Sequence, residues 1–196
     1  MKFRAVIMIA IAATLSACGV NSVPTAEENA KARWADVQAA YQRRADTIPN
    51  VVATVKGSAA SEGKILTDVV NARANATKVQ INAGDLTDPA KVASFQQAQG
   101  ALGASLGRLL ATVEAYPTLQ SQANFQALIR EIEGSNNRIT IAIRDYNTAV
   151  QAYNTKIRTF PDAIGAKIFY GAKPMVPFQA APGADANPNV DFGNTN

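Results

Sequence analysis

Histidine is absent from this 196-residue sequence, and Cys18 is its only cysteine. The lack of histidine removes the commonest general base and the commonest metal ligand of proteins. A single cysteine cannot form an intramolecular disulfide, so the folded chain must be held together by a packed core. Di-iron bundles built on Glu-x-x-His pairs are also excluded. We therefore expect a protein that is not an enzyme, with no metal site and no cofactor.

A strong charge of one sign is lacking as well. The chain has 19 basic and 15 acidic residues, and two of the basic residues, Lys2 and Arg4, lie at the extreme N-terminus. Nucleic-acid-binding domains usually carry a clustered basic face, so this small excess of positive charge argues against a nucleic-acid partner. Glu131 and Glu133 do not form a catalytic pair, because residues two apart on a helix point in different directions.

The first 18 residues have the pattern of a bacterial lipoprotein signal. Lys2 and Arg4 precede an apolar run over residues 5–15, and residues 15–18 read Leu-Ser-Ala-Cys. Small residues before the cleavage site are what a signal peptidase requires. We expect residues 1–17 to be removed as a signal peptide and Cys18 to carry a diacylglycerol and an N-acyl chain. Two or three acyl chains hold a protein firmly at a membrane, whereas one does so only marginally.

Two other interpretations of this segment remain open. An uncleaved membrane helix needs roughly 20 apolar residues, which is longer than the run in question; a chance motif would leave Cys18 as a buried, unmodified thiol. Gly19 follows the cysteine where an aspartate would signal retention at the inner membrane. In a host with two membranes we therefore expect anchoring to the outer membrane, facing the periplasm, with residues 18–25 as a lipidated tether.

Apolar residues recur at steps of three and four over most of the following chain, which is the spacing of amphipathic helices. Thr25 begins a capping-box pattern that predicts the start of the first helix. Pro49 predicts a break followed by a second helix, which would run to about residue 82. Two further helices are predicted, ending at Pro117 and Pro161.

The C-terminal part, residues 162–196, is rich in proline, glycine and asparagine. This composition predicts an irregular tail. Phe178, Val190 and Phe192 are isolated apolar residues in it, so we expect part of the tail to pack on the helices while the last residues stay disordered. The predicted fold is all-α: an elongated, antiparallel, up-and-down four-helix bundle in residues 26–161, followed by a non-helical C-terminal tail.

Several segments carry motifs of a known family. Residues 41–52 read Tyr-Gln-Arg-Arg-Ala-Asp-Thr-Ile-Pro-Asn-Val-Val, residues 131–134 read Glu-Ile-Glu-Gly, and residues 144–150 read Arg-Asp-Tyr-Asn-Thr-Ala-Val. Near the end, Phe178 and the Val-Asp-Phe of residues 190–192 follow. In this order, and over nearly all of the chain after the signal, these segments resemble the LemA family.

The resemblance implies an antiparallel helical bundle held at a membrane by its N-terminus, with no established catalytic activity. It also implies an envelope protein partner, since genes of this family often lie near those of membrane proteases and TPM-domain proteins. Some members belong to membrane-shaping systems such as magnetosome formation. Many relatives keep an uncleaved membrane helix where this chain has its lipoprotein signal.

Three arginines of the first predicted helix, Arg33, Arg43 and Arg44, are candidates for contact with a partner or with anionic head groups. Arg33 and Arg44 are eleven residues apart, close to three helical turns. The alternative is a solvated face on which the arginines pair with Asp36 and Asp46.

A seven-residue repeat in the fourth predicted helix places Tyr146 and Asn147 on nearly the same face as Tyr153 and Asn154. These four residues are candidates for a polar ladder that recognises a partner. The structural interpretation, which we favour, is that the tyrosines fill the core with their hydroxyls near an edge. The asparagines would then fix helix register through satisfied interior hydrogen bonds.

The function expected from these features is that of a membrane-anchored, non-catalytic scaffold or adaptor at the bacterial cell envelope. The alternative is a periplasmic accessory module that binds a small ligand or a lipid between helix ends near Trp34 and the tyrosines. A core that is completely filled would count against this alternative.

Overall fold

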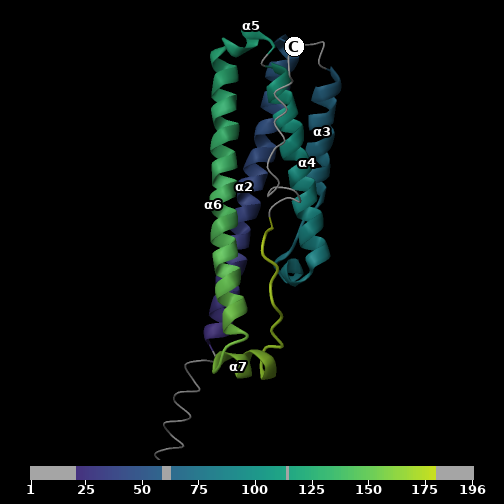
Figure 1. The fold of residues 1–196 in the computed structure, drawn as a ribbon. Coiled ribbons are helices and arrows are strands. Elements are labelled where there is room, and N and C mark those ends of the chain that lie inside the picture. Colours follow the sequence, from purple (N-terminus) through teal and green to yellow (C-terminus); the bar gives the residue numbers. More distant parts are fainter. Residues whose placement is uncertain (1–20, 59–62, 114, 180–196) are drawn as a thin grey trace, which may run out of the picture.

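The computed structural model describes residues 21–58, 63–113 and 115–179, and Figure 1 shows them as an elongated bundle of helices. The body consists of α2 (Ser22–Ser58), α3 (Gly63–Lys78), α4 (Pro89–Val113) and α6 (Ala123–Lys156). Short helices lie between or after them: η2 (Ala83–Thr87), α5 (Pro117–Gln120) and α7 (Asp162–Ile168). The predicted all-α, antiparallel bundle is confirmed. The predicted signal peptide of residues 1–17, Cys18, Val190 and Phe192 lie outside the described residues.

The four long helices form two antiparallel pairs of unequal length. α2 packs along α6 and α3 packs along α4, with α2 and α3 in contact between the pairs. At about 1.5 Å per residue, α2 and α6 exceed 50 Å, whereas α3 is about 24 Å and α4 about 37 Å long. The α3–α4 pair therefore leaves part of the α2–α6 pair uncovered. Residues 172–179, which we call the strap, run from α7 along this uncovered part (Figure 1).

The interior divides into two hydrophobic clusters along the bundle. One lies between the upper parts of the helices and is built on aliphatic residues such as Val51, Leu102 and Leu109. The other lies nearer the α7 end, contains Trp34 and Tyr146, and includes Met175 and Phe178 of the strap. The strap thus supplies the apolar side chains that a longer α3–α4 pair would otherwise bring to this region.

The first helix starts earlier than the sequence predicted. α2 begins at Ser22, so residues 22–25, which were expected to belong to the tether, are part of the helix. The Thr25 hydroxyl donates to the carbonyl oxygen of Asn21 at 2.7 Å. This backward bond, typical of a hydroxyl residue inside a helix, replaces the predicted cap.

Pro49 does not break the first helix, which was the main error in the predicted boundaries. α2 continues through Pro49 to Ser58, and the next helix occupies Gly63–Lys78 and ends before residue 82. Proline has no N–H to donate to the carbonyl four residues earlier, which is that of Ala45. The Nε of Arg73 on α3 donates to this carbonyl oxygen at 2.7 Å. A side chain from the neighbouring helix therefore satisfies the group that the proline leaves open.

Part of the expected irregular tail is helical. Residues 162–168 form α7, whose Gly165 and Ala166 are buried. After α7, Gly171 adopts a left-handed conformation with φ of 54° and the chain turns into the strap. Glycine adopts this conformation without the steric cost that a Cβ atom brings.

No helix among the described residues is long and apolar enough to cross a membrane. The same part of the chain also contains no cluster of three or more Asp, Glu, Cys or His side chains that could hold a metal ion.

Candidate functional site

Two asparagines of α6 bind the backbone of the strap. Asn147 donates from Nδ2 to the carbonyl of Phe178 at 3.0 Å and accepts from the Phe178 N–H at 2.8 Å. Asn154 binds Met175 in the same way, at 2.8 and 2.9 Å. Each carboxamide therefore satisfies both backbone groups of one strap residue.

Two tyrosines of α6 add a second row of bonds to the strap. The Tyr146 hydroxyl donates to the carbonyl of Val176 at 2.9 Å, and that of Tyr153 donates to the carbonyl of Lys173 at 3.1 Å. Seven residues on a helix span about 10.5 Å, and three residues of extended chain span about 10 Å. The seven-residue repeat of α6 therefore matches strap residues three apart. We call these four side chains and the strap backbone the clasp.

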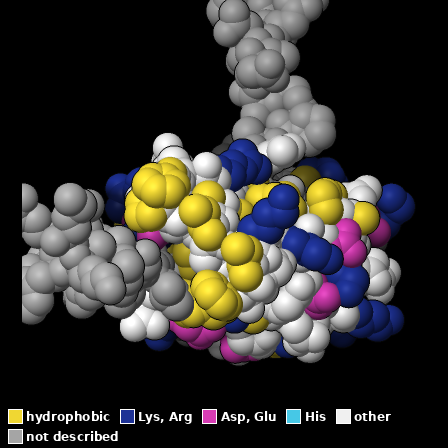
Figure 2. Space-filling model, turned by 90° about the horizontal axis from the view of Figure 1, so that it is seen from below, with side chains coloured by type: hydrophobic (Ala, Val, Ile, Leu, Met, Phe, Trp, Pro, Cys, Tyr) yellow, Lys and Arg dark blue, Asp and Glu magenta, His cyan; other side chains and the backbone are white. Residues whose placement is uncertain are grey.

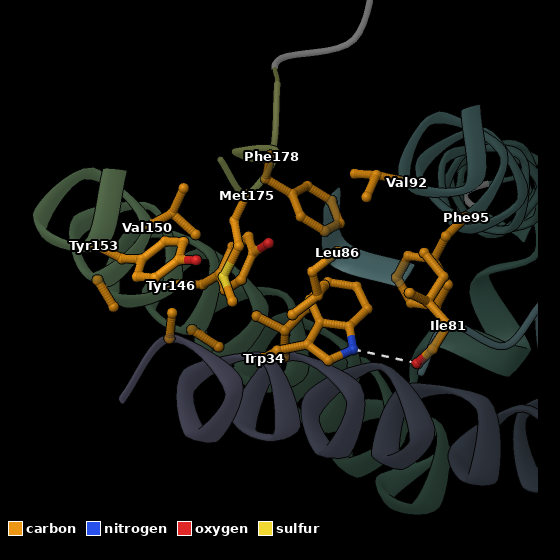
Figure 3. Packing of buried hydrophobic residues seen from close by; sticks show 14 of the residues in the cluster. Trp34, Ile81, Leu86, Val92, Phe95, Tyr146, Val150, Tyr153, Met175 and Phe178 are labelled. Carbon is orange, nitrogen blue, oxygen red and sulfur yellow. Dashed lines mark hydrogen bonds between the residues drawn. The ribbon is translucent and has the colours of Figure 1, made fainter. Parts of the chain in front are cut away.

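The side chains of the strap enter an aromatic cluster. The ring of Phe178 lies 6.0 Å from Trp34, 6.2 Å from Phe95 and 6.4 Å from Tyr146, between ring centroids. Figure 3 shows these rings converging from α2, α4, α6 and the strap, with the Trp34 indole N–H donating to the carbonyl of Ile81 at 3.3 Å. The space beside Trp34 is thus occupied by the protein's own side chains.

Burial controls the ionisation of the clasp tyrosines. Desolvation raises the pKa of Tyr146 well above its ordinary value. It also raises the pKa of Tyr153, to which the negative charge of Glu27 adds. Both phenols therefore remain neutral near pH 7 and act as hydrogen-bond donors. The clasp is suited to holding an extended peptide backbone.

The sequence placed the four clasp residues on one face but did not identify what they bind. We expected the asparagines to act on helix register, and in the structure their partners are strap residues 21 and 31 positions further along the chain. The signal that could have suggested the strap is the spacing of Met175 and Phe178, which matches the helical repeat. Phe178 was recognised as an isolated apolar residue, whereas Met175 was missed.

The three candidate arginines of α2 lie in three different environments. Arg33 is exposed and pairs with Asp36 at 3.2 Å, as the solvated-face interpretation predicted. Arg43 is exposed. Arg44 is only 6% exposed, so the expected contact with a partner or head group does not hold for this residue. Asp46, the other expected acidic partner, accepts a hydrogen bond from Gln42.

Arg44 instead forms a buried polar contact with α4. Its Nη2 donates to the backbone carbonyl of Gln99 at 2.9 Å and to the side-chain oxygen of Gln99 at 3.0 Å. Its guanidinium carbon lies 5.0 Å from the centre of the Tyr41 ring, and burial lowers the pKa of Arg44. Sequence reasoning missed Gln99, although this polar residue continues the apolar stripe of Val92 and Phe95 at the helical step.

Arg43 lines a shallow groove between α2 and α6. The groove has a volume of about 350 Å³ and is also lined by Arg138 and by Ile141, which is half exposed. The groove's two acidic residues already have partners, since Asp36 pairs with Arg33 and Asp145 pairs with Arg144. Among the described residues neither Arg43 nor Arg138 forms an ion pair. We call this surface the arginine groove.

Comparison with known proteins places this architecture in a family. A model described as LemA family matches residues 33–192. The chain is 28% identical over 157 residues to magnetosome proteins MamQ 2 and MamQ 1 of Paramagnetospirillum magneticum. It is 26% identical over 161 residues to magnetosome protein MamQ of Magnetospirillum gryphiswaldense. Each match covers 72% of this chain but only 58% of the relative. The extent of the family match shows that the chain belongs to the LemA family.

Proposed function

We propose that this protein is a lipid-anchored, non-catalytic scaffold or adaptor at the bacterial cell envelope. The observation that carries the proposal is the occupation of the aromatic interior by the protein's own strap, through the Phe178 ring and the six clasp bonds. A ligand carrier would need that space for its cargo. Contacts on the outer faces of the long helices are therefore the better-supported mode of action.

The arginine groove is the partner surface that we propose. Arg43 and Arg138 come from the two longest helices and present positive charge that no described acidic side chain neutralises by pairing. Ile141 adds apolar contact area beside them. Such a surface fits an acidic segment with an apolar side chain on an envelope protein. The gene neighbourhoods of the LemA family favour a membrane protease or a TPM-domain protein as that partner.

The anchor is proposed to be Cys18, acylated after removal of residues 1–17, with the outer membrane favoured in a host that has two membranes. It is tested by growing cells with an alkyne analogue of palmitate and fractionating their membranes. The wild-type protein should take up the label and sediment with membranes, and Cys18→Ala should do neither. Retention of unlabelled Cys18→Ala in the membrane fraction to the wild-type extent would refute the anchor.

The partner surface is tested by charge reversal on the full-length protein. Arg43→Glu combined with Arg138→Glu should abolish crosslinks between the groove and its envelope partner, identified by mass spectrometry. Arg130→Glu combined with Arg108→Glu reverses the same number of exposed charges elsewhere on α6 and α4 and serves as the matched control. Equal loss of crosslinks in both variants would show that only general charge matters and would contradict a specific role for the groove.

A further inference from the structure

Large apolar side chains are exposed at the end of the molecule that carries α7. Five of the seven exposed large apolar residues in the described chain fall within residues 160–170: Phe160 (82%), Ile168 (69%), Phe169 (67%), Ile164 (52%) and Tyr170 (41%). We call them the apolar cap. Figure 2 views this end of the molecule and shows hydrophobic side chains gathered on it, with lysines, arginines and some acidic side chains at their border. Contiguous exposed apolar surface of this kind marks an interaction site.

The fold holds the side chains of the apolar cap in an outward orientation. In α7 the small residues Gly165 and Ala166 are buried, whereas Ile164 and Ile168 point outward. A helix that merely covered a core would have the opposite arrangement. The Ala172 N–H donates to the Ala166 carbonyl at 3.0 Å, and the clasp then fixes the strap that follows. The outward apolar face is therefore held in place by the buried residues of α7 and by the segment that follows this helix.

Positive charge accompanies the apolar cap. Residues 156–173 contain four basic side chains, Lys156, Arg158, Lys167 and Lys173, and a single acidic one, Asp162. Lys156 pairs with Asp162 at 3.6 Å, and the other three basic residues form no ion pair among the described residues. Glu27 and Glu28 of α2 share the single cation of Lys31, which leaves one net negative charge there against the three unpaired basic residues. Exposed apolar side chains bordered by unpaired cations match the chemistry of an anionic bilayer surface.

The start of the described chain lies at this same end. The first turns of α2 and the short helix α7 lie together at the lower end of Figure 1. Cys18 precedes Asn21 by three residues, which span at most about 11 Å of extended chain. An acylated Cys18 would therefore keep this end of the bundle next to the membrane.

We propose that the apolar cap inserts into the interfacial layer of an anionic bilayer, so that the bundle stands on the membrane on its α7 end. This inference rests on the proposed lipid anchor and adds to it a second, protein-borne contact. Tyr170 suits the boundary between head groups and acyl chains, because its ring is apolar and its hydroxyl polar.

The test introduces an indole into the apolar cap of the full-length protein by Phe169→Trp. The protein is reconstituted in vesicles of phosphatidylethanolamine and phosphatidylglycerol that contain brominated acyl chains. Val70→Trp, at a half-exposed position of α3, is the matched control, and the buried native Trp34 supplies the same background in both. We expect strong quenching and a blue-shifted emission for Phe169→Trp only, and weaker quenching when phosphatidylcholine replaces the anionic lipid.

Two results would overturn the proposal. In one, the introduced indole is quenched by aqueous iodide as strongly as the control and is unaffected by brominated lipid. In the other, it is protected from both quenchers, which would show that a protein, such as a second copy of this chain, covers the apolar cap. Mass spectrometry of the same vesicle-bound protein separates this proposal from the anchor. If Cys18 is acylated but the lipid does not quench the indole, only the insertion of the apolar cap is refuted. If the lipid quenches the indole but the thiol is bare, only the lipid anchor is refuted.

Discussion

At the scale of single residues, the clasp depends on side chains that can donate and accept at once. Only a carboxamide offers an N–H donor and a carbonyl acceptor at the end of one short side chain. Asn147 and Asn154 use both to pair with strap residues as a neighbouring β-strand would. Because these bonds go to backbone groups, they fix the path of the strap whatever its side chains are.

Removing one carboxamide should loosen the strap. Asn154→Ala leaves the N–H and carbonyl of Met175 without their partner, and we expect the free energy of unfolding to fall by about 1–3 kcal/mol. Urea denaturation measures this change. Asn136→Ala, at an exposed position of the same helix, should stay within about 0.5 kcal/mol of wild type. Equal effects of the two substitutions would contradict the clasp.

The buried phenol of Tyr146 should make stability depend on alkaline pH. Its pKa is raised by burial above the ordinary value of 10.0. The folded state therefore holds the proton more tightly than the unfolded state, so this side chain stabilises the fold fully below pH 10.0 and progressively less as the pH rises above that value.

Tyr146→Phe should lower the free energy of unfolding by about 1 kcal/mol at pH 7, because the Val176 carbonyl loses its donor. The difference in the free energy of unfolding between variant and wild type should then decrease as the pH rises above 10.0. Urea denaturation of both proteins from pH 7 to pH 11 tests this. A difference in the free energy of unfolding that stays constant across this range would show that the phenol ionises equally in the folded and unfolded states.

The candidate residues show which features of the site the helical periodicity of the sequence can predict. The seven-residue repeat was enough to place Tyr146, Asn147, Tyr153 and Asn154 on one face, because a helix has a fixed pitch. The strap partner was not predictable, since contacts 20 to 31 residues apart depend on how α7 turns the chain. Arg44 was misplaced on the surface for a similar reason, because its partner Gln99 lies on another helix.

At the scale of elements, the apolar stripes of the sequence predict α4 and α6 well, but they do not predict where α2 ends. The local rule for proline predicted a break at Pro49. It failed because a distant residue, Arg73, donates to the carbonyl of Ala45 that proline leaves open. α7 was missed because seven residues are too few to fold on propensity alone, so its stability must come from packing.

The role of Arg73 can be measured with a double-mutant cycle. Arg73→Met should lower the free energy of unfolding by about 1–3 kcal/mol, because the buried Ala45 carbonyl loses its charged donor. In a Pro49→Ala background the new N–H can bond to that carbonyl, so the same substitution should cost less. We expect a coupling energy of about 0.5–3 kcal/mol. A coupling energy of zero would mean that Arg73 does not compensate for the proline.

Gly171 should be the glycine whose replacement harms the turn into the strap. Gly171→Ala should destabilise the fold by about 1–2 kcal/mol, since an L-residue is strained in the left-handed conformation. Gly107→Ala, in the exposed middle of α4, should instead stabilise it by up to about 1 kcal/mol. A Cβ atom would meet no neighbour within 4 Å at either position, so opposite shifts in thermal midpoint isolate the backbone effect. Shifts of the same sign would contradict this assignment.

At the scale of the whole molecule, the two proposed contact surfaces lie at the α7 end and along the side of the bundle. The α7 end carries the apolar cap, basic residues and the start of α2. The sides carry the arginine groove between α2 and α6. The strap fills the interior that a ligand carrier would leave open. A rod standing on a membrane, with its binding surface along its length, is the account that joins these features.

Intact-mass spectrometry of the protein extracted from membranes tests this account most directly. We predict a chain that begins at Cys18, lacks residues 1–17 and carries the added mass of a diacylglycerol and an N-acyl chain. A chain that keeps residues 1–17 and bears a free thiol at Cys18 would contradict the central claim, the lipid anchor.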